Sequence, residues 1–156
     1  MIPGTLCDYN LFKYQTEGLK DLVDCHVACN SSASSLKQVA KNILEKQTGS
    51  FSVMGLSYGG IIAFELLRQA PERINKLVLM NTNYKEPSEQ TRINQQRFIG
   101  MAYLGEFEEI TSEILIDAML HPKNAKKQEL RETVLNMALN VGIDGFFNQV
   151  KAQLAR

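Results

Sequence analysis

The residues with the clearest chemical potential lie in positions 51–60, which read FSVMGLSYGG. Gly55, Ser57 and Gly59 form a G-x-S-x-G pattern between a short apolar run and a run typical of a helix. In a strand–turn–helix setting this pattern predicts a nucleophile elbow, in which a sharp turn exposes the serine hydroxyl. A Cβ atom two residues before or after the serine would collide with the strand or helix backbone. The sequence therefore predicts that Ser57 is a nucleophile and that the two glycines make room for it.

A nucleophilic serine also needs a base, and histidine is the usual one. The chain has two histidines. His26 precedes the serine in a predicted strand, where we expect a structural residue. His121 ends a predicted helix, where a favourable interaction with the helix dipole is the default role. Asp117 and Asp144 fall on predicted helices and are expected on solvated surfaces. The sequence thus provides a nucleophile without a recognisable catalytic acid or base.

The elements that must position Ser57 alternate between strand and helix patterns up to about residue 84. In order, we predict a helix over 9–22 capped by Asp8, a strand over 23–29, a helix from 36 capped by Ser35, the strand before the elbow, a helix over 61–68 and a strand over 76–81. Strands separated by helices of this length imply crossover connections and a parallel sheet. We therefore expect residues 1–84 to form a partial α/β core.

The pattern changes to helix alone after residue 85. One helix is expected to start at residues 87–88, and apolar stripes over 107–118, 130–141 and 146–154 predict three more. Gly105, the His121–Pro122 step and Gly142 separate them. These stripes are narrow, so the helices must pack on one another and on the sheet. We expect residues 85–156 to form a helical cap.

Composition excludes several classes of function. The chain has 156 residues, a formal net charge of zero and 44% hydrophobic residues, which suits one folded domain and gives no sign of a nucleic-acid partner. No apolar run approaches the roughly 20 residues needed to span a bilayer, and the start does not have the form of a signal peptide. Cys7, Cys25 and Cys29 are odd in number and lack C-x-x-C spacing, which favours reduced thiols and a cytoplasmic location. No metal or cofactor motif is present.

Two stretches resemble the α/β-hydrolase superfamily, in particular its small esterase-like branch. They are residues 2–8, IPGTLCD, and the elbow with its continuation RQAPER at 68–73. The resemblance implies a partial α/β-hydrolase fold with equivalents of strands β3 to β6 and a helical lid over residues 85–156. It also implies an oxyanion hole formed by the backbone N–H groups of Thr5 and Tyr58.

The function that this resemblance implies is esterase-like hydrolysis. Ser57 would attack a small, hydrophobic ester, and the chain would end before the family's catalytic Asp and His. Residues 81–83, Asn-Thr-Asn, stand where some members carry the acid. Two alternatives stay open: a non-catalytic relic or interaction module that keeps the elbow for packing, and a complete enzyme that uses His121.

Two further expectations concern surfaces. The apolar strand over 76–80 is expected to have an unpaired edge, which invites self-association or pairing with another chain. Aromatic and apolar residues of the cap are available to line a pocket for a hydrophobic ester, although packing between the helices is the simpler reading. They are Phe98, Met101, Tyr103, Phe107, Phe146 and Phe147.

Overall fold

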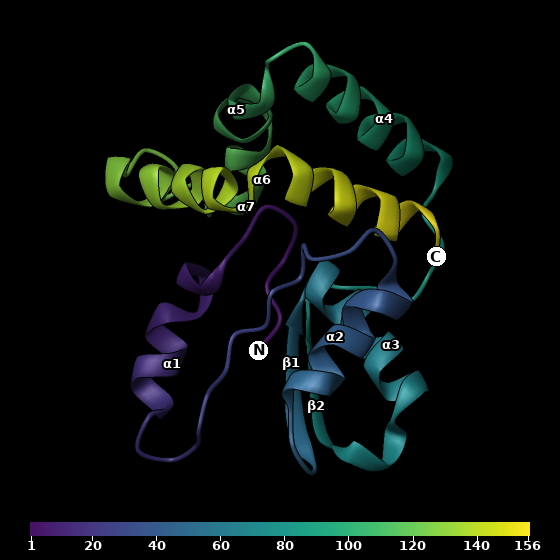
Figure 1. Ribbon diagram of the computed structural model, residues 1–156. Helices are drawn as coiled ribbons and strands as arrows, with labels where there is room; N and C mark the ends of the chain where they lie inside the picture. The colour runs from purple at the N-terminus through teal and green to yellow at the C-terminus, as the bar shows by residue number, and fades with distance from the viewer.

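The computed structural model describes the backbone of residues 1–156 and every side chain except that of Glu113. Figure 1 shows a small sheet with helices α2 and α3 beside it, helix α1 on the far side of β1 from α2, and helices α4 to α7 above. No helix among the described residues is long and apolar enough to cross a membrane.

The sheet consists of two parallel strands, β1 (Phe51–Leu56) and β2 (Ile74–Met80), with Val53 beside Leu77. Helix α3 (Tyr58–Gln69) and the 3₁₀ turn η2 (Pro71–Arg73) connect them. On the other edge of β1, Ile2 forms an isolated parallel bridge with Gly55. The parallel sheet and the helix after the elbow, both predicted from the sequence, are confirmed.

Strand β2 is an edge strand, as the sequence predicted for residues 76–80. Among the described strands it pairs with β1 alone. Val78 and Leu79 are 44% and 40% exposed, so apolar side chains accompany the unpaired backbone groups. This edge meets the conditions under which a strand accepts another chain.

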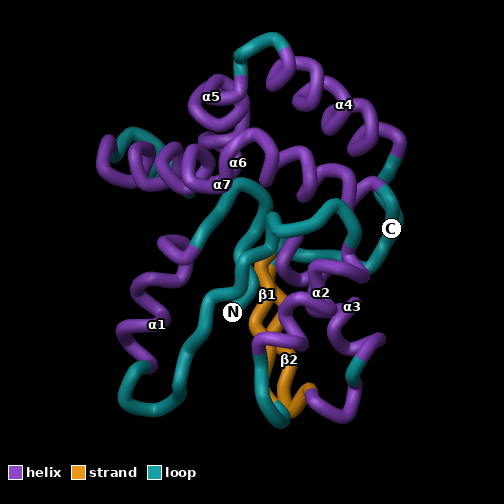
Figure 2. The backbone as a smooth tube through the Cα atoms, in the orientation of Figure 1, coloured by secondary structure: helices purple, strands orange, loops and turns teal.

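The predicted strand over 23–29 is wrong, because the segment has a neighbour at only one position. The Met1 nitrogen donates to the His26 carbonyl over 2.6 Å, and the Ala28 N–H donates to the Met1 carbonyl over 2.9 Å. A strand needs a partner along its length, and one residue does not provide it. The segment therefore runs as part of the long loop that Figure 2 draws between α1 and α2.

The first helical segment follows its predicted cap. The Asp8 carboxylate accepts the Asn10 N–H over 2.8 Å, and a 3₁₀ turn, η1 (Tyr9–Phe12), leads into α1 (Lys13–Leu19). The predicted helix over 9–22 thus exists but ends at Leu19. Helix α2 (Leu36–Lys46) begins after Ser35, whose hydroxyl accepts the Gln38 N–H over 3.2 Å.

Arg73 fixes the end of α2 to the start of the sheet. Its guanidinium donates to three backbone carbonyls, those of Leu44 at 3.1 Å, Gln47 at 2.8 Å and Gly49 at 2.9 Å. It also lies 5.4 Å from the ring centroid of Phe51, a cation–π distance. A cation at a helix C-terminus satisfies carbonyls that have no partner within the helix. Arg73, in the turn η2 after α3, therefore holds the residues that lead from α2 into β1.

The helical region after residue 85 contains the four predicted segments. Helix α4 (Glu89–Tyr103) follows the N-cap Ser88, and α5 (Phe107–Glu109), the π-helical turn η3 (Ile110–Leu115) and α6 (Ile116–Met119) form the second segment. The third and fourth are the two arms of α7 (Gln128–Leu154), which bends at Gly142, where φ is 70°. The second arm packs on the N-terminal part of the chain.

Two buried clusters join the cap to that N-terminal part. Ala152 of α7 is fully buried in the cluster that contains Ile2 and Tyr58. Leu6 is buried among Phe146 and other residues of the cap. The second arm of α7 therefore lies on the loop that follows Ile2.

The cap's aromatic residues pack on one another. The rings of Tyr103 and Phe147 stack with centroids 4.8 Å apart, and those of Phe107 and Phe146 are 5.8 Å apart. Neither of the two cavities described below is lined by them. Their observed role is to hold the cap helices together.

Candidate active site

Ser57 occupies a strained turn between β1 and α3. Its φ of 51° and ψ of −114° lie in a region that residues with a Cβ rarely adopt, at a cost of about 1–3 kcal/mol. Two hydrogen bonds hold this conformation. The Ser57 N–H donates to the Met80 carbonyl over 2.9 Å, and the Thr82 hydroxyl donates to the Ser57 carbonyl over 2.8 Å. The backbone of the serine is thus bonded on both sides to β2 and the residues after it.

The two glycines of the motif lie against backbone atoms. A Cβ on Gly55 would stand 2.5 Å from the Gly59 carbonyl oxygen. A Cβ on Gly59 would overlap the Ile2 carbonyl oxygen and stand 2.6 Å from the Pro3 oxygen. Contacts below 3.0 Å with backbone cannot be relieved by a side-chain movement. The glycines therefore bring three segments together: β1, the start of α3 and the loop after Ile2.

The candidate oxyanion hole has two backbone N–H groups, those of Thr5 and Tyr58. In the described part of the chain neither N–H donates a hydrogen bond to a partner. Tyr58 is the first residue of α3, where N–H groups have no acceptor within the helix and the helix dipole favours negative charge. Both N–H groups are thus without a hydrogen-bond partner among the described residues.

A buried polar network holds the loop that carries Thr5. The Leu6 N–H donates to Gln149 Oε1 over 3.0 Å, and Gln149 Nε2 donates to Asn30 Oδ1 over 2.8 Å. Asn30 Nδ2 donates in turn to the carbonyls of Pro3 at 2.7 Å and Gly4 at 3.1 Å. Gln149 is fully buried and Asn30 is 3% exposed. The loop is therefore fixed from two directions, by α7 and by the segment before α2.

Sequence reasoning missed this network. One signal was available. Gln149 follows Phe146 by three residues and precedes Val150, so it shares a helix face with these apolar residues. An apolar residue is the usual choice on a face that packs against the core. A polar side chain at a buried helix position needs hydrogen-bond partners. Its partners lie 119 and 143 residues away, and the sequence does not identify them.

Thr5 itself also contacts α7. Its hydroxyl accepts a hydrogen bond from Gln153 Nε2 over 3.1 Å, and Gln153 Nε2 also donates to the Gln149 carbonyl over 3.1 Å. The positive φ of 57° at Leu6 turns the chain away directly afterwards. Helix α7 thus contacts both residues that follow the Pro3–Gly4 turn.

Both histidines and Asp117 have other partners, and Asp144 is exposed. His26 Nε2 lies 3.1 Å from Asp24 Oδ2 on an exposed loop, and His121 Nδ1 accepts the Lys123 N–H over 3.2 Å. Asp117 lies 3.4 Å from Arg131. In the part of the chain that the structure describes, no hydrogen bond joins either histidine to Ser57. Among the described side chains, neither histidine is placed as a base for the serine.

The Tyr58 phenol points into the core and not toward the candidate site. The side chain is fully buried in the apolar cluster beneath the elbow, and its hydroxyl has no hydrogen-bond partner among the described residues. Burial raises the pKa of this phenol well above its usual value. The hydroxyl therefore stays protonated at neutral pH and cannot act as the missing base.

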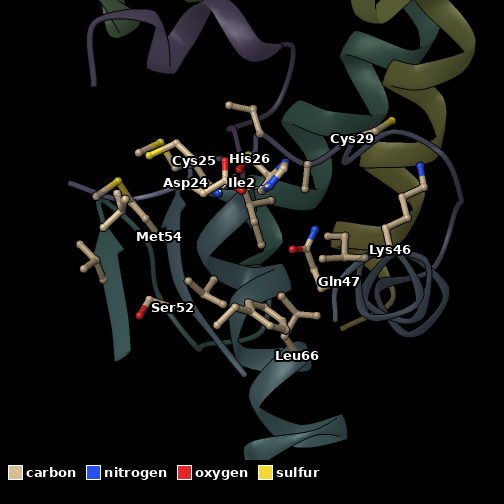
Figure 3. Close-up of a pocket in the computed structure, with 18 of the residues that line it drawn as sticks. Ile2, Asp24, Cys25, His26, Cys29, Lys46, Gln47, Ser52, Met54 and Leu66 are labelled. Carbon is tan, nitrogen blue, oxygen red and sulfur yellow. Dashed lines mark hydrogen bonds and ion pairs between the residues drawn. The ribbon is translucent and has the colours of Figure 1, made fainter. Parts of the chain in front are cut away.

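The described cavities lie away from Ser57. The larger, about 780 Å³, opens between the 23–29 loop and the free edge of β1, and Figure 3 shows residues that line it. The smaller, about 190 Å³, lies between Ile61, Phe64 and Tyr84. Ser57 lines neither. The described residues also contain no group of three or more His, Cys, Asp or Glu side chains that could hold a metal ion.

A family model described as alpha/beta hydrolase fold matches residues 20–135, which include the elbow, both strands and most of the cap. No curated protein matches the chain.

Proposed function

Because this chain belongs to the alpha/beta hydrolase fold family, we propose that it carries the nucleophile and the oxyanion hole of an esterase-like serine hydrolase. Ser57 Oγ attacks the carbonyl carbon of the ester, and the carbonyl oxygen becomes an oxyanion between the N–H groups of Thr5 and Tyr58. Each such donor is worth about 2.7–4 kcal/mol in comparable sites. The alcohol leaves as the acyl-serine forms, and water then hydrolyses that ester.

The observation that carries this proposal is the combination of a strained Ser57 with two backbone N–H groups that have no described partner, one on α3 and one on the loop after Ile2. Ser57 is held at φ 51°, and the two nearby N–H groups have no described partner. A turn that only connected a strand to a helix would not need a strained serine. Strain of this kind persists where the surrounding structure imposes it, and it clusters at active sites.

The proposal includes a base that neither histidine nor the Tyr58 phenol, as the structure describes them, contributes. Both histidines have partners away from Ser57, and the Tyr58 phenol stays protonated. A serine without a base is a weak nucleophile at neutral pH. We therefore assign the acid and base to another polypeptide segment, and the unpaired edge of β2 is the surface that would accept it.

The substrate we propose is a small hydrophobic ester, with residues 85–156 as the lid over a cytoplasmic enzyme. The support is the position of α7, which contacts Thr5 and Leu6 and so borders the proposed oxyanion hole. A lid placed there would exclude water from the oxyanion and strengthen its interactions with both donors.

Chemical rescue tests the proposal directly. Imidazole at high concentration replaces the missing base, and p-nitrophenyl acetate serves as the ester. We expect imidazole-dependent acetylation of Ser57, detected by intact mass and peptide mapping, and its loss in Ser57→Ala. Ser34→Ala, which changes an exposed serine, is the matched control and keeps the acetylation. Acetylation of lysines alone, equal in Ser57→Ala, would contradict the proposal.

A second candidate function is a non-catalytic interaction module that keeps the elbow as a packing feature. The observation that favours it is the absence of Ser57 from both described cavities. This alternative predicts a folded protein that is never acetylated at Ser57 with imidazole, even when a segment bearing Asp and His is added. The rescue experiment therefore separates the two candidates.

A further inference from the structure

The peptide unit between Ser57 and Tyr58 has the serine carbonyl at one end and a proposed oxyanion donor, the Tyr58 N–H, at the other. The bond is trans. In a trans peptide the C=O and the N–H point in opposite directions, and the atoms of the unit move together as one plane. Any group that fixes the direction of the Ser57 carbonyl therefore also fixes the direction of the Tyr58 N–H.

The Ser57 carbonyl accepts three hydrogen bonds. Two come from the first turn of α3, from the Gly60 N–H over 2.9 Å and the Ile61 N–H over 3.2 Å. The third comes from the Thr82 hydroxyl over 2.8 Å. Of the three, the Thr82 bond is the shortest, and it alone comes from outside α3. The residues that follow β2 thus contact the peptide unit that carries the proposed donor.

The first turn of α3 is a weak restraint on this peptide unit. Gly59 and Gly60 are its second and third residues, and glycine has more backbone freedom than any other residue. The shorter of the two helical bonds, from Gly60, spans three residues and is of the 3₁₀ type, which is common where a helix begins and its end frays. A contact from outside the helix is therefore needed to hold the plane of the peptide in one orientation.

The chain after β2 is bent so that Thr82 reaches this peptide. Asn81 has a φ of 43°, a left-handed conformation that asparagine tolerates better than most residues. The residue before it, Met80, accepts the Ser57 N–H through its carbonyl, and the residue after it, Thr82, donates to the Ser57 carbonyl. Residues 80–82 thus bond to both backbone groups of the serine.

The Thr82 side chain also packs on the start of α3. A Cβ on Gly60 would stand 2.5 Å from Thr82 Cγ2 and 2.7 Å from Thr82 Oγ1. Threonine is branched at Cβ, so the positions of its methyl and hydroxyl groups are tied to one stiff torsion. Contact of the side chain with Gly60 and the hydrogen bond to Ser57 therefore support the same placement of the hydroxyl.

We propose that Thr82 is a positioning residue, whose hydroxyl fixes the plane of the Ser57–Tyr58 peptide and so directs the Tyr58 N–H toward the oxyanion. A donor at the carbonyl also polarises the peptide, because hydrogen bonds in a chain strengthen one another. The inference rests on the proposed function for the oxyanion, whereas the hold on the peptide can be tested without it. Residues 81–83, which provide amides where an acid was sought, thus have a role through the threonine between them.

Selective isotope labelling observes this peptide alone. Ser57–Tyr58 is the one place in the sequence where a tyrosine follows a serine. Serine labelled with ¹³C at the carbonyl and tyrosine labelled with ¹⁵N therefore give a single carbonyl–amide correlation by NMR. We expect Thr82→Val, which replaces the hydroxyl by a methyl group, to shift the carbonyl frequency in the direction of a lost hydrogen bond. Thr82→Ser keeps the hydroxyl and should return the correlation close to its original position.

Thr133→Val is the matched control. The Thr133 hydroxyl donates to the Glu129 carbonyl over 2.8 Å within α7, so this variant loses the same kind of bond at the same length away from Ser57. The Ser57–Tyr58 correlation should stay in place in Thr133→Val. An unmoved correlation in Thr82→Val, or an equal shift in both valine variants, would overturn the proposal.

Acetylation of Ser57 by p-nitrophenyl acetate with imidazole tests the consequence for the oxyanion. Thr82→Val should slow it about tenfold or more, less than the roughly hundredfold or greater cost of losing a whole oxyanion donor. Thr82→Ser should restore most of the rate, and Thr133→Val should keep it. An unchanged rate in Thr82→Val despite a shifted correlation would overturn the link between Thr82 and the oxyanion.

The two proposals can fail separately. If the unchanged protein is never acetylated at Ser57, the proposed function fails. The NMR correlation needs no reaction at the serine, and it then still decides whether the Thr82 hydroxyl holds the Ser57–Tyr58 peptide. If acetylation proceeds and the correlation does not respond to Thr82→Val, the proposed function stands and the role of Thr82 is overturned.

Discussion

Gly59 faces Ile2 so closely that a methyl group on its α carbon would overlap the Ile2 carbonyl oxygen. The same methyl group would stand 2.6 Å from the carbonyl oxygen of Pro3. The start of α3 therefore lies directly on the loop that carries Thr5. One glycine sets the separation between the two proposed oxyanion donors.

Gly59→Ala should destabilise the protein, because the added methyl group meets backbone that cannot move without displacing the loop. We expect a loss of about 1–3 kcal/mol or more in the free energy of unfolding, measured by urea titration. Gly100→Ala is the matched control, since a Cβ there meets nothing within 4 Å. That helical substitution should be neutral or stabilising. Equal effects of the two variants would contradict the close approach.

Gln149→Met should cost about 2–3 kcal/mol of unfolding free energy, because it leaves the Leu6 N–H and the side-chain Oδ1 of Asn30 without their partner in a buried site. Faster hydrogen exchange at the Leu6 amide should accompany this loss. Gln153→Met, at a partly buried position of the same helix, is the control and should cost less than about 1 kcal/mol. Unchanged exchange at Leu6 in Gln149→Met would show that the network does not hold the loop.

Cys7 should make stability fall at alkaline pH. Burial, with a smaller contribution from Asp8, raises the pKa of its thiol from 9.0 to about 12. The folded protein then keeps a proton that the unfolded chain releases as the pH rises above about 9. The Cys7 contribution is fully present below that pH and decreases by about 1.4 kcal/mol per pH unit up to the folded value.

Urea titrations at about pH 8 and about pH 10 measure this effect. The difference in unfolding free energy between the two values should shrink in Cys7→Ala. It should persist in Cys29→Ala, because Cys29 is exposed. The same pH dependence in all three proteins would assign it to other groups.

Tyr58→Phe should stabilise the protein by about 1 kcal/mol, because it removes a buried hydroxyl that has no described partner. Thermal unfolding with and without the substitution measures the change. Tyr103→Phe, at a position 74% exposed, should change stability by less than about 0.5 kcal/mol. Destabilisation by Tyr58→Phe would mean that the hydroxyl has a hydrogen bond in solution, for example to water.

The sequence predicted those elements whose conformation is set by near neighbours. The elbow follows from the spacing of Gly55, Ser57 and Gly59, and the space that Gly55 needs is set by Gly59 and Gly60 close by in the sequence. The helix caps at Asp8, Ser35 and Ser88 are equally local. For these the residue types and their spacing carry the relevant physics.

Features that depend on distant partners were not predictable in the same way. The alternating apolar residues of 23–29 suit a strand, but only Met1 stands beside them. The Gln149–Asn30 contact joins residues 119 positions apart. Spacing alone also could not show that the aromatic residues of the cap would pack on one another instead of lining a pocket.

The hydrogen bonds from Ser57 to Met80 and from Thr82 to Ser57 link the serine's orientation to the outermost strand of the sheet. The backbone conformation of Ser57 therefore depends on β2 and the residue Thr82 after it, and not on α3 alone. The free edge of β2 is open to another polypeptide. A strand that pairs there would straighten or twist β2, and two hydrogen bonds would transmit that change to the serine. Assembly and reactivity would then be mechanically coupled through a single turn.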